Sequence, residues 1–230
     1  MKQLLLFSSL LIAILSISCK NHKTEVATKT DKNDTEILSL VFDTLVGNKE
    51  HWKFNFLPNR IPLIDDENYA ENKIKQQKEI DSALTKWYSV QIIVFVNERS
   101  QIPSYLLDNF RYLSEKESFK FNFKSADSSY RQLLINLIED TTSIQFDLGK
   151  IKTAYDYKLK YLSSRQKKEP NTFIIGNVTF SKIVYNKEKT VACLYSELVC
   201  GGECGYGNIY FLMKRESKWS ISSYHNIWVS

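Results

Sequence analysis

The chain has 230 residues, of which 43% are hydrophobic and 13% aromatic, and its 31 basic and 26 acidic residues give a net charge of +5. This apolar content excludes an intrinsically disordered protein and suffices for one domain with a substantial core. The charges are interspersed, and the one notable basic run is Arg165-Gln166-Lys167-Lys168, so we expect a solvated surface and no nucleic-acid partner.

The N-terminus has the pattern of a secretory signal peptide over residues 1–18. A lysine is followed by an apolar stretch, residues 4–17, which is shorter than the ~20 residues that a membrane-spanning helix needs. The segment LSISC, residues 15–19, resembles a bacterial lipobox, with Ser16 where an aliphatic residue is usual. The resemblance implies cleavage before Cys19 and acylation of that cysteine; an ordinary cleaved signal and an uncleaved anchor are the alternatives.

An acylated Cys19 makes a membrane the expected partner, because several acyl chains hold a protein at a bilayer far longer than one chain does. Lys20 follows the cysteine in place of an aspartate, which in the logic of lipoprotein sorting favours the outer membrane. We therefore expect an outer-membrane lipoprotein of the cell envelope that faces the periplasm or the surface. Residues 19–34 contain little apolar surface and are interpreted as a flexible tether with a reach of ~20 Å.

The first predicted element of the folded part is a helix whose N-cap is Asp34 or Thr35. Its apolar positions repeat every three to four residues, and Gly47 ends it. Trp52, Phe54 and Phe56 then alternate with polar residues, which predicts a strand. Further along we expect a helix over 66–86, a strand over 87–97, a helix over 104–112, a strand over 119–123, a helix over 130–138 and strands over 144–148 and 155–161, the last of which could equally be helical.

After residue 172 the helical periodicity disappears. Four short β-prone runs follow one another, NVTFSKIVYN, TVACLYSEL, NIYFLMKR and KWSISSYH, with short polar or glycine-rich separators. Successive strands joined by short turns predict an antiparallel meander. The predicted fold class is therefore α+β, with helices and strands mixed early and a C-terminal antiparallel β-meander, in one domain over residues 35–230.

The loop CGGECGYG, residues 200–207, holds four of the seven glycines of the chain and two of its four cysteines. With Cys19 acylated, three cysteines remain, so one disulfide is possible and three pairings are open. Cys193 lies inside a strand pattern and is expected to be buried. Cys200 and Cys204 flank a tight turn at a separation that suits a disulfide, which we favour; two free thiols are the alternative. The glycines supply the positive φ angles of such a turn.

Chemical roles for this loop have little support in the sequence. A zinc site wants four ligands, commonly in CxxC pairs, and the spacing here is CxxxC with only His225 nearby in sequence, so we expect no metal and no cofactor. A thiol enzyme would need Cys200 or Cys204 free and close to His225. The carboxylates of Asp65-Asp66-Glu67 and Glu139-Asp140 are expected to be solvated. Aromatic residues of the meander could form an exposed docking surface: Tyr206, Tyr210 and Trp228.

The C-terminal third also resembles a group of uncharacterised Bacteroidota exported or lipid-anchored proteins. The residues that carry the resemblance are FSKIVYN (residues 180–186), Ala192, CGGECGYG, YFLMKRESKWSI (residues 210–221) and the terminal IWVS. The resemblance covers about 55 residues and implies location and fold, with no catalytic residue to carry over. One glycine more than in the commonest form separates the two cysteines.

These observations predict a lipid-anchored envelope protein that is a binding or assembly module rather than an enzyme. Its partner would be an envelope protein or a glycan that docks at the aromatic surface. The alternative is an envelope hydrolase or thiol enzyme that uses the loop of Cys200 and Cys204.

Overall fold

The structure is a computed structural model that describes residues 31–57, 69–115, 128–140, 142–165 and 170–230. The signal peptide, Cys19 and the strand predicted over 119–123 lie outside the described residues. Within them, helices and one seven-stranded mixed sheet confirm the α+β class. No helix in these ranges is long and apolar enough to cross a membrane.

The first helix, α2 (Lys32–Val46), begins one turn earlier than the sequence predicts. Its N-cap is Asp31, and Asp31 and Asp34 form a reciprocal capping box, each side chain accepting from the other's backbone N–H. Asp34, the predicted cap, is therefore the third helical residue. Gly47 ends the helix at φ 71°, as expected for a residue in the left-handed region.

The segment after Gly47 is a helix, α3 (Lys49–Phe56), so the strand predicted here is wrong. Asn48 caps it by accepting from the backbone N–H of Glu50 at 3.0 Å. Trp52 is buried, and its indole Nε1 donates to the carbonyl of Val46 at 2.9 Å. Trp52, Phe54 and Phe56 follow one another at intervals of two residues, as in a strand. Trp52 and Phe56 are also four residues apart, which is a helical spacing.

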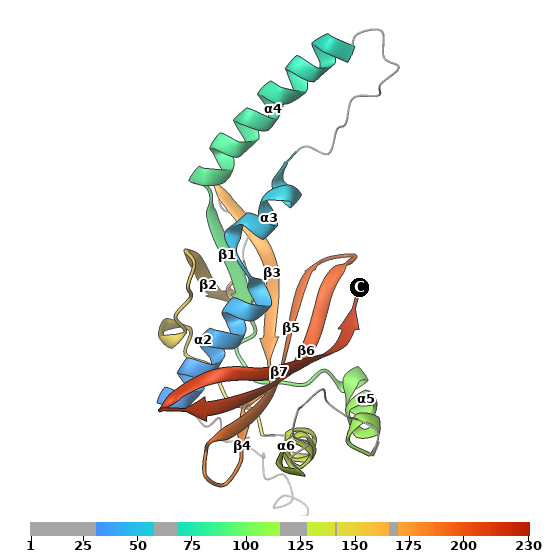
Figure 1. The fold of residues 1–230 in the computed structure, drawn as a ribbon. Helices are drawn as coiled ribbons and strands as arrows, with labels where there is room; N and C mark the ends of the chain where they lie inside the picture. Colours follow the sequence, from blue (N-terminus) through green and yellow to red (C-terminus); the bar gives the residue numbers. More distant parts are fainter. Residues whose placement is uncertain (1–30, 58–68, 116–127, 141, 166–169) are drawn as a thin grey trace, which may run out of the picture.

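The long helix α4 (Tyr69–Ser89) extends away from the rest of the molecule (Figure 1). It runs further than predicted, so that Trp87 belongs to the helix, where its buried ring meets Phe173 at 5.3 Å between ring centroids. The strand β1 (Gln91–Val96) follows, starting four residues later than the predicted strand.

Two further helices, α5 (Ser104–Glu115) and α6 (Ser128–Glu139), confirm the helical patterns of the sequence. The strand predicted over 144–148 is wrong. Gln145 forms only an isolated bridge with Arg99, and the chain then enters a short 3₁₀ helix.

The remaining elements are the strands β2 (Tyr157–Tyr161), β3 (Thr172–Phe180), β4 (Val184–Tyr185), β5 (Val191–Gly201), β6 (Cys204–Arg215) and β7 (Lys218–Val229) and the 3₁₀ helices η1 (Leu148–Lys150) and η2 (Leu162–Ser164). The sheet order is β2-β1-β3-β5-β6-β7, with β4 beside β5. β1 pairs in parallel with β2 and β3, whereas all later pairs are antiparallel, which confirms the predicted meander.

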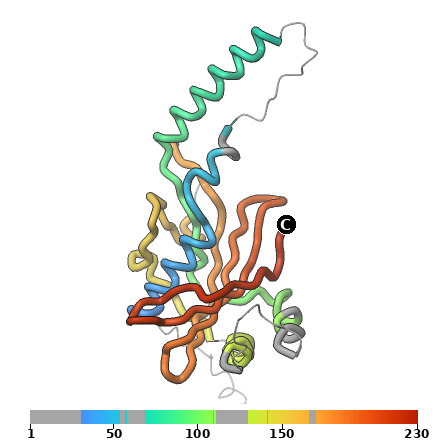
Figure 2. The backbone as a smooth tube through the Cα atoms, viewed as in Figure 1, coloured from blue at the N-terminus to red at the C-terminus, as the bar shows by residue number. Residues whose placement is uncertain are grey.

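Helices cover both faces of the sheet. α2 packs on one face, in a core that includes Phe42, Val94, Leu194 and Tyr210. α5 and α6 pack on the other face, over Cys193, Tyr195, Ile209 and Phe211 of β5 and β6. Two irregularities interrupt the pairing of β6 with β7. Such bulges increase strand twist, and the long C-terminal strands curl visibly in Figure 2.

Candidate functional site

The cysteine-glycine loop is a covalently closed turn at the tip of the β5–β6 hairpin. Cys200 and Cys204 form a disulfide with 5.1 Å between their Cα atoms, which confirms the predicted pairing. Cys193 is free and fully buried, and burial raises the pKa of its thiol well above the ordinary value. None of these three cysteines therefore offers an exposed free thiol.

Two glycines of the loop sequence make room for Trp228. A Cβ atom on Gly205 would lie 2.9 Å from the Trp228 ring, and one on Gly207 would lie 2.9 Å from Trp228 Cδ1 and still closer to the Tyr195 hydroxyl. The indole Nε1 of Trp228 donates to Tyr195 Oη at 2.8 Å, and that hydroxyl donates to Glu197 at 2.6 Å. These glycines are thus required by packing.

Tyr210 does not belong to an exposed aromatic docking surface, so this part of the prediction is wrong. Its side chain is 1% exposed and lies in the core under α2. Tyr206 packs on the same side, and its hydroxyl donates to the carbonyl of Leu45. Trp228 packs with the cluster on the opposite face of the sheet. Side chains alternate between the two faces along β6, so Tyr206 and Tyr210 lie on the same face. Trp228, the cross-strand partner of Gly207, lies on the other face.

His225 is not brought to the disulfide. It pairs with Ile209 in the sheet, five positions along β6 from Cys204, a separation of roughly 16 Å along the strand. Burial lowers the pKa of this histidine. Among the described residues no group of three or more His, Cys, Asp or Glu side chains is arranged to hold a metal ion.

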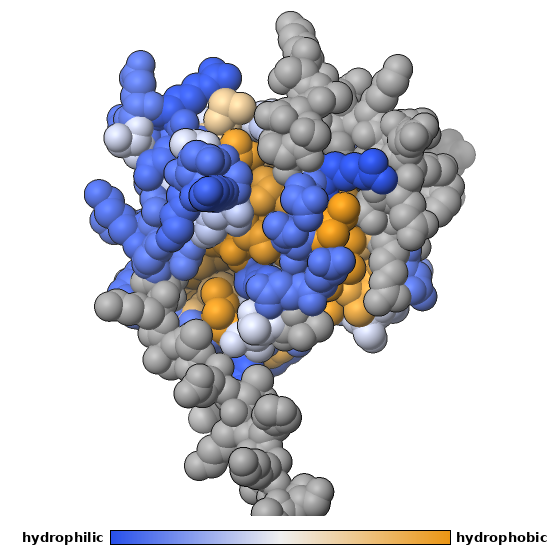
Figure 3. All heavy atoms as spheres, turned by 90° about the horizontal axis from the view of Figure 1, so that it is seen from below, coloured by the Kyte–Doolittle hydropathy of each residue, from blue (hydrophilic) through white to orange (hydrophobic). Residues whose placement is uncertain are grey.

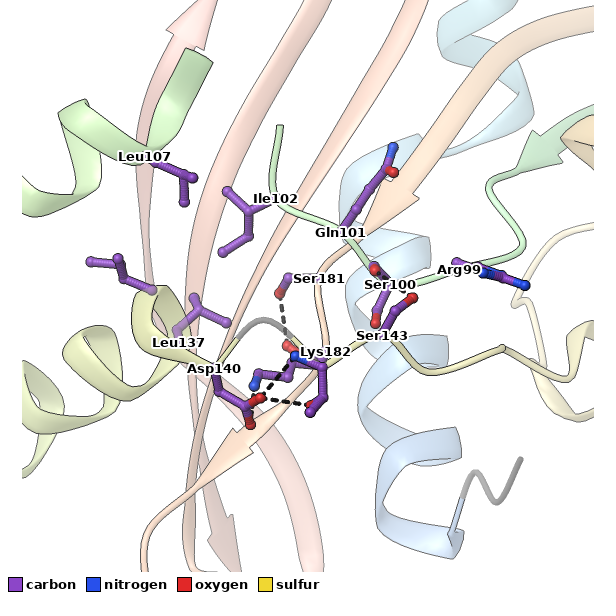
Figure 4. Close-up of a pocket in the computed structure, with 12 residues that line it drawn as sticks. Arg99, Ser100, Gln101, Ile102, Leu107, Leu137, Asp140, Ser143, Ser181 and Lys182 are labelled. Atoms are coloured by element: carbon purple, nitrogen blue, oxygen red, sulfur yellow. Dashed lines mark hydrogen bonds and ion pairs between the residues drawn. The ribbon is translucent and has the colours of Figure 1, made fainter. Parts of the chain in front are cut away.

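A cavity of about 320 Å³ lies between the two helices α5 and α6 and the connection from β3 to β4. Its lining comes from three stretches that are far apart in the sequence: Arg99–Ile102 with Leu107; Leu137–Ile138 with Asp140, Thr142 and Ser143; and Ser181–Lys182. In Figure 4, Ile102, Leu107 and Leu137 point toward a common space, with Lys182 and Asp140 at one end of it, and Arg99 points away. The cavity thus has an apolar wall and a polar end.

Lys182 is the buried charge of this cavity. Its side chain is 8% exposed and forms an ion pair with Asp140, whose side chain is 50% exposed. Burial lowers the pKa of Lys182 to about 8. Lys182 Nζ donates no hydrogen bond of ordinary geometry to a described residue. The ammonium therefore has unused capacity to donate.

The serines of the cavity are engaged mainly with the backbone. Ser181 Oγ donates to the carbonyl of Lys182 at 2.7 Å and accepts from the N–H of Tyr195 at 2.8 Å. Ser100 Oγ accepts from Ile144 N at 2.8 Å, and Ser143 Oγ donates to the carbonyl of Ser100 at 3.2 Å. These bonds fix the two connections that carry Lys182 and Asp140.

Asp140 is held by the turn after α6. Its Oδ1 accepts from the N–H of Thr142 at 3.0 Å and from the Thr142 hydroxyl at 2.6 Å, which leaves Oδ2 for Lys182. Asp140 is thus half-exposed, as the sequence predicts, and it is in addition paired with Lys182. The two charged residues are 42 positions apart in the sequence, so no local pattern joins them. The available signal was a lysine within the β-prone stretch Phe180-Ser181-Lys182-Ile183.

The chain matches no protein-family model, no curated protein and no solved structure. Its structure offers a cavity with the buried ammonium of Lys182 in the lining, which suits recognition of a small molecule.

Proposed function

We propose that this protein is a lipid-anchored envelope protein whose folded domain binds a small molecule in the cavity between α5, α6 and the β3–β4 connection. The observation that carries the proposal is the cavity itself. It combines an apolar wall with a few convergent polar groups and has the size of a small-ligand site. On the face seen in Figure 3, hydrophobic residues reach the surface between hydrophilic ones.

Binding is favoured over catalysis by the state of the nucleophiles. A covalent mechanism needs a thiol or hydroxyl within hydrogen-bond reach of a base. In the described part of the chain, Cys200 and Cys204 are joined to each other and Cys193 is buried. Ser181 Oγ already donates to one backbone group and accepts from another. The thiol-enzyme alternative therefore gains no support from this arrangement.

The anchor is supported by the sequence LSISC at residues 15–19. Labelling of cells with radioactive palmitate tests it. We expect label in the wild-type protein, no label in the Cys19→Ala variant, and accumulation of the unprocessed precursor when the lipoprotein signal peptidase is inhibited. Equal labelling of wild type and variant would contradict the anchor.

The cavity is tested with the neutral fluorescent probe N-phenyl-1-naphthylamine. We expect its fluorescence to rise on binding, and a Leu107→Trp variant, which fills the cavity, to reduce that rise at least about fivefold. The matched control is Ile74→Trp, at a side chain of α4 that is 59% exposed and lies outside the cavity lining. Similar losses in both variants, or none in either, would place binding elsewhere.

A further inference from the structure

We propose that the cavity takes a small amphipathic carboxylate, whose carboxylate group binds the Lys182 ammonium in place of Asp140. This inference rests on the proposed binding function and adds the chemical class of the ligand. It follows from three observations: the unused donors of Lys182, the partial exposure of Asp140, and the apolar wall beside them.

The first observation concerns the donors of Lys182. An ammonium carries three N–H donors and no acceptor, and a buried polar group normally finds partners for them. Asp140 supplies one carboxylate oxygen, and no described residue adds a hydrogen bond of ordinary geometry. Ser100 Oγ, also in the lining, accepts from Ile144 N and so has its hydroxyl proton left to donate. The polar end therefore offers donors, and a matching ligand must offer acceptors.

The second observation concerns the carboxylate of Asp140, which is paired with the Lys182 ammonium. Half of the Asp140 side chain is exposed, whereas Lys182 is buried. A carboxylate that leaves the ammonium at this position regains water, so its displacement costs less than that of a buried partner would. A ligand carboxylate that arrives with an apolar body brings the same charge to the same place. Asp140 thus stands where the ligand head group would bind, and the exchange leaves the charge at Lys182 balanced.

The third observation concerns the rest of the ligand. Ile102, Leu107, Leu137 and Ile138 form the apolar part of the lining, beside Lys182. An apolar body placed against these side chains is removed from water, which adds binding free energy in proportion to the buried area. The volume of about 320 Å³ limits that body to a short chain or a small ring system.

Octanoate is the probe for this proposal, and octanamide is its uncharged match. The protein is the chain from Lys20 onward, which contains every described element. Titrations followed by ¹H–¹⁵N spectra give the dissociation constant and the position of the site. We expect octanoate to bind at least about tenfold more tightly than octanamide, because charge-assisted hydrogen bonds are the stronger ones.

Two substitutions at the ion pair should act in opposite directions. Lys182→Met should weaken octanoate binding at least about tenfold, whereas Asp140→Asn should tighten it about threefold or more, because the competing carboxylate is gone. The controls apply the same changes to an exposed ion pair outside the cavity, Lys150→Met and Asp147→Asn, and should leave the constant unchanged. Far-ultraviolet circular dichroism and thermal unfolding show whether each variant is folded.

Weaker octanoate binding in Lys182→Met together with tighter binding in Asp140→Asn would support the proposal. If the ion pair were purely structural, removal of either partner would weaken binding. Equal affinity for octanoate and octanamide, or weaker binding in Asp140→Asn, would overturn it. If N-phenyl-1-naphthylamine still binds and Leu107→Trp still blocks it, the binding function survives and only the carboxylate class is wrong. If neither probe binds, both fail.

Discussion

At the scale of single residues, the glycines after the disulfide are explained by contacts rather than by turn geometry. Gly207→Ala would drive a methyl group into Trp228 and the Tyr195 hydroxyl, so we expect the free energy of unfolding to fall by about 1–3 kcal/mol. Gly202→Ala is the matched control, because nothing lies within 4 Å of its added Cβ, and it should change stability by less than about 0.5 kcal/mol. Urea denaturation of both variants checks this, and equal effects would contradict the packing role.

The disulfide allows a second residue-scale prediction. It closes a loop of only a few residues, so chain-entropy arguments give a stabilisation of about 2 kcal/mol. The double variant Cys200→Ser, Cys204→Ser should lose that amount in urea denaturation. Reductant should lower the stability of the wild type to that of the double variant and leave the variant unchanged. A reductant effect on both proteins would point to another cause.

Lys182 should make stability depend on pH. Its pKa is about 8 in the folded protein and 10.5 in its ordinary state, so between these values the unfolded chain binds more protons at this site. Folding should therefore be increasingly favoured as the pH rises through 8 toward 10.5, and this contribution should be lost as the pH falls through 8. Asp140 is the charged side chain paired with the ammonium, and Arg99 of the same lining points away (Figure 4).

The measurement is the difference in unfolding free energy between wild type and Lys182→Met at about pH 7.5 and about pH 9.5. Other titrating groups are common to both proteins and cancel in this difference. We expect the wild type to gain stability relative to the variant at the higher pH. A difference that stays constant or shrinks with pH would contradict the buried state of this ammonium.

At the scale of elements, the antiparallel meander could be predicted because each of its hairpins is local and bounded by a short turn. Helix α3 could not, because a segment with aromatic residues at spacings of two and four fits both periods. The capped turn at Asn48 and the bond from Trp52 to Val46 select the helix, and the second of these is a tertiary contact. Likewise the pairing of Asp140 with Lys182 arises only when α6 meets the β3–β4 connection.

The docking of α2 onto the sheet gives an element-scale prediction. The hydroxyl of Tyr185, at the end of β4, donates to Asp34 Oδ1 at 2.5 Å, in a partly buried contact. Tyr185→Phe removes a hydrogen bond to a carboxylate and should cost about 1.5–3 kcal/mol of unfolding free energy. Tyr224→Phe, at a side chain that is 61% exposed, is the control and should be close to neutral. Equal stability of Tyr185→Phe and wild type would show that this contact does not hold α2.

At the scale of the whole molecule, the arrangement suggests how an anchored protein would be presented. The N-terminal end of α2, at Lys32, lies at the end of the molecule that also holds the β6–β7 turn, and α4 projects from the opposite end (Figure 1). An anchor at Cys19 would therefore join the folded part at the end opposite α4. The cavity lies among α5, α6 and the β3–β4 connection, so ligand binding need not involve α4.

The most direct measurement of the binding function is a crystal structure of the protein grown with an excess of octanoate. Electron density for the fatty acid should fill the space between Ile102, Leu107 and Leu137, with its carboxylate at Lys182 Nζ and Asp140 turned toward solvent. An intact pair of Lys182 and Asp140 beside an unfilled cavity, at saturating ligand, would contradict the account.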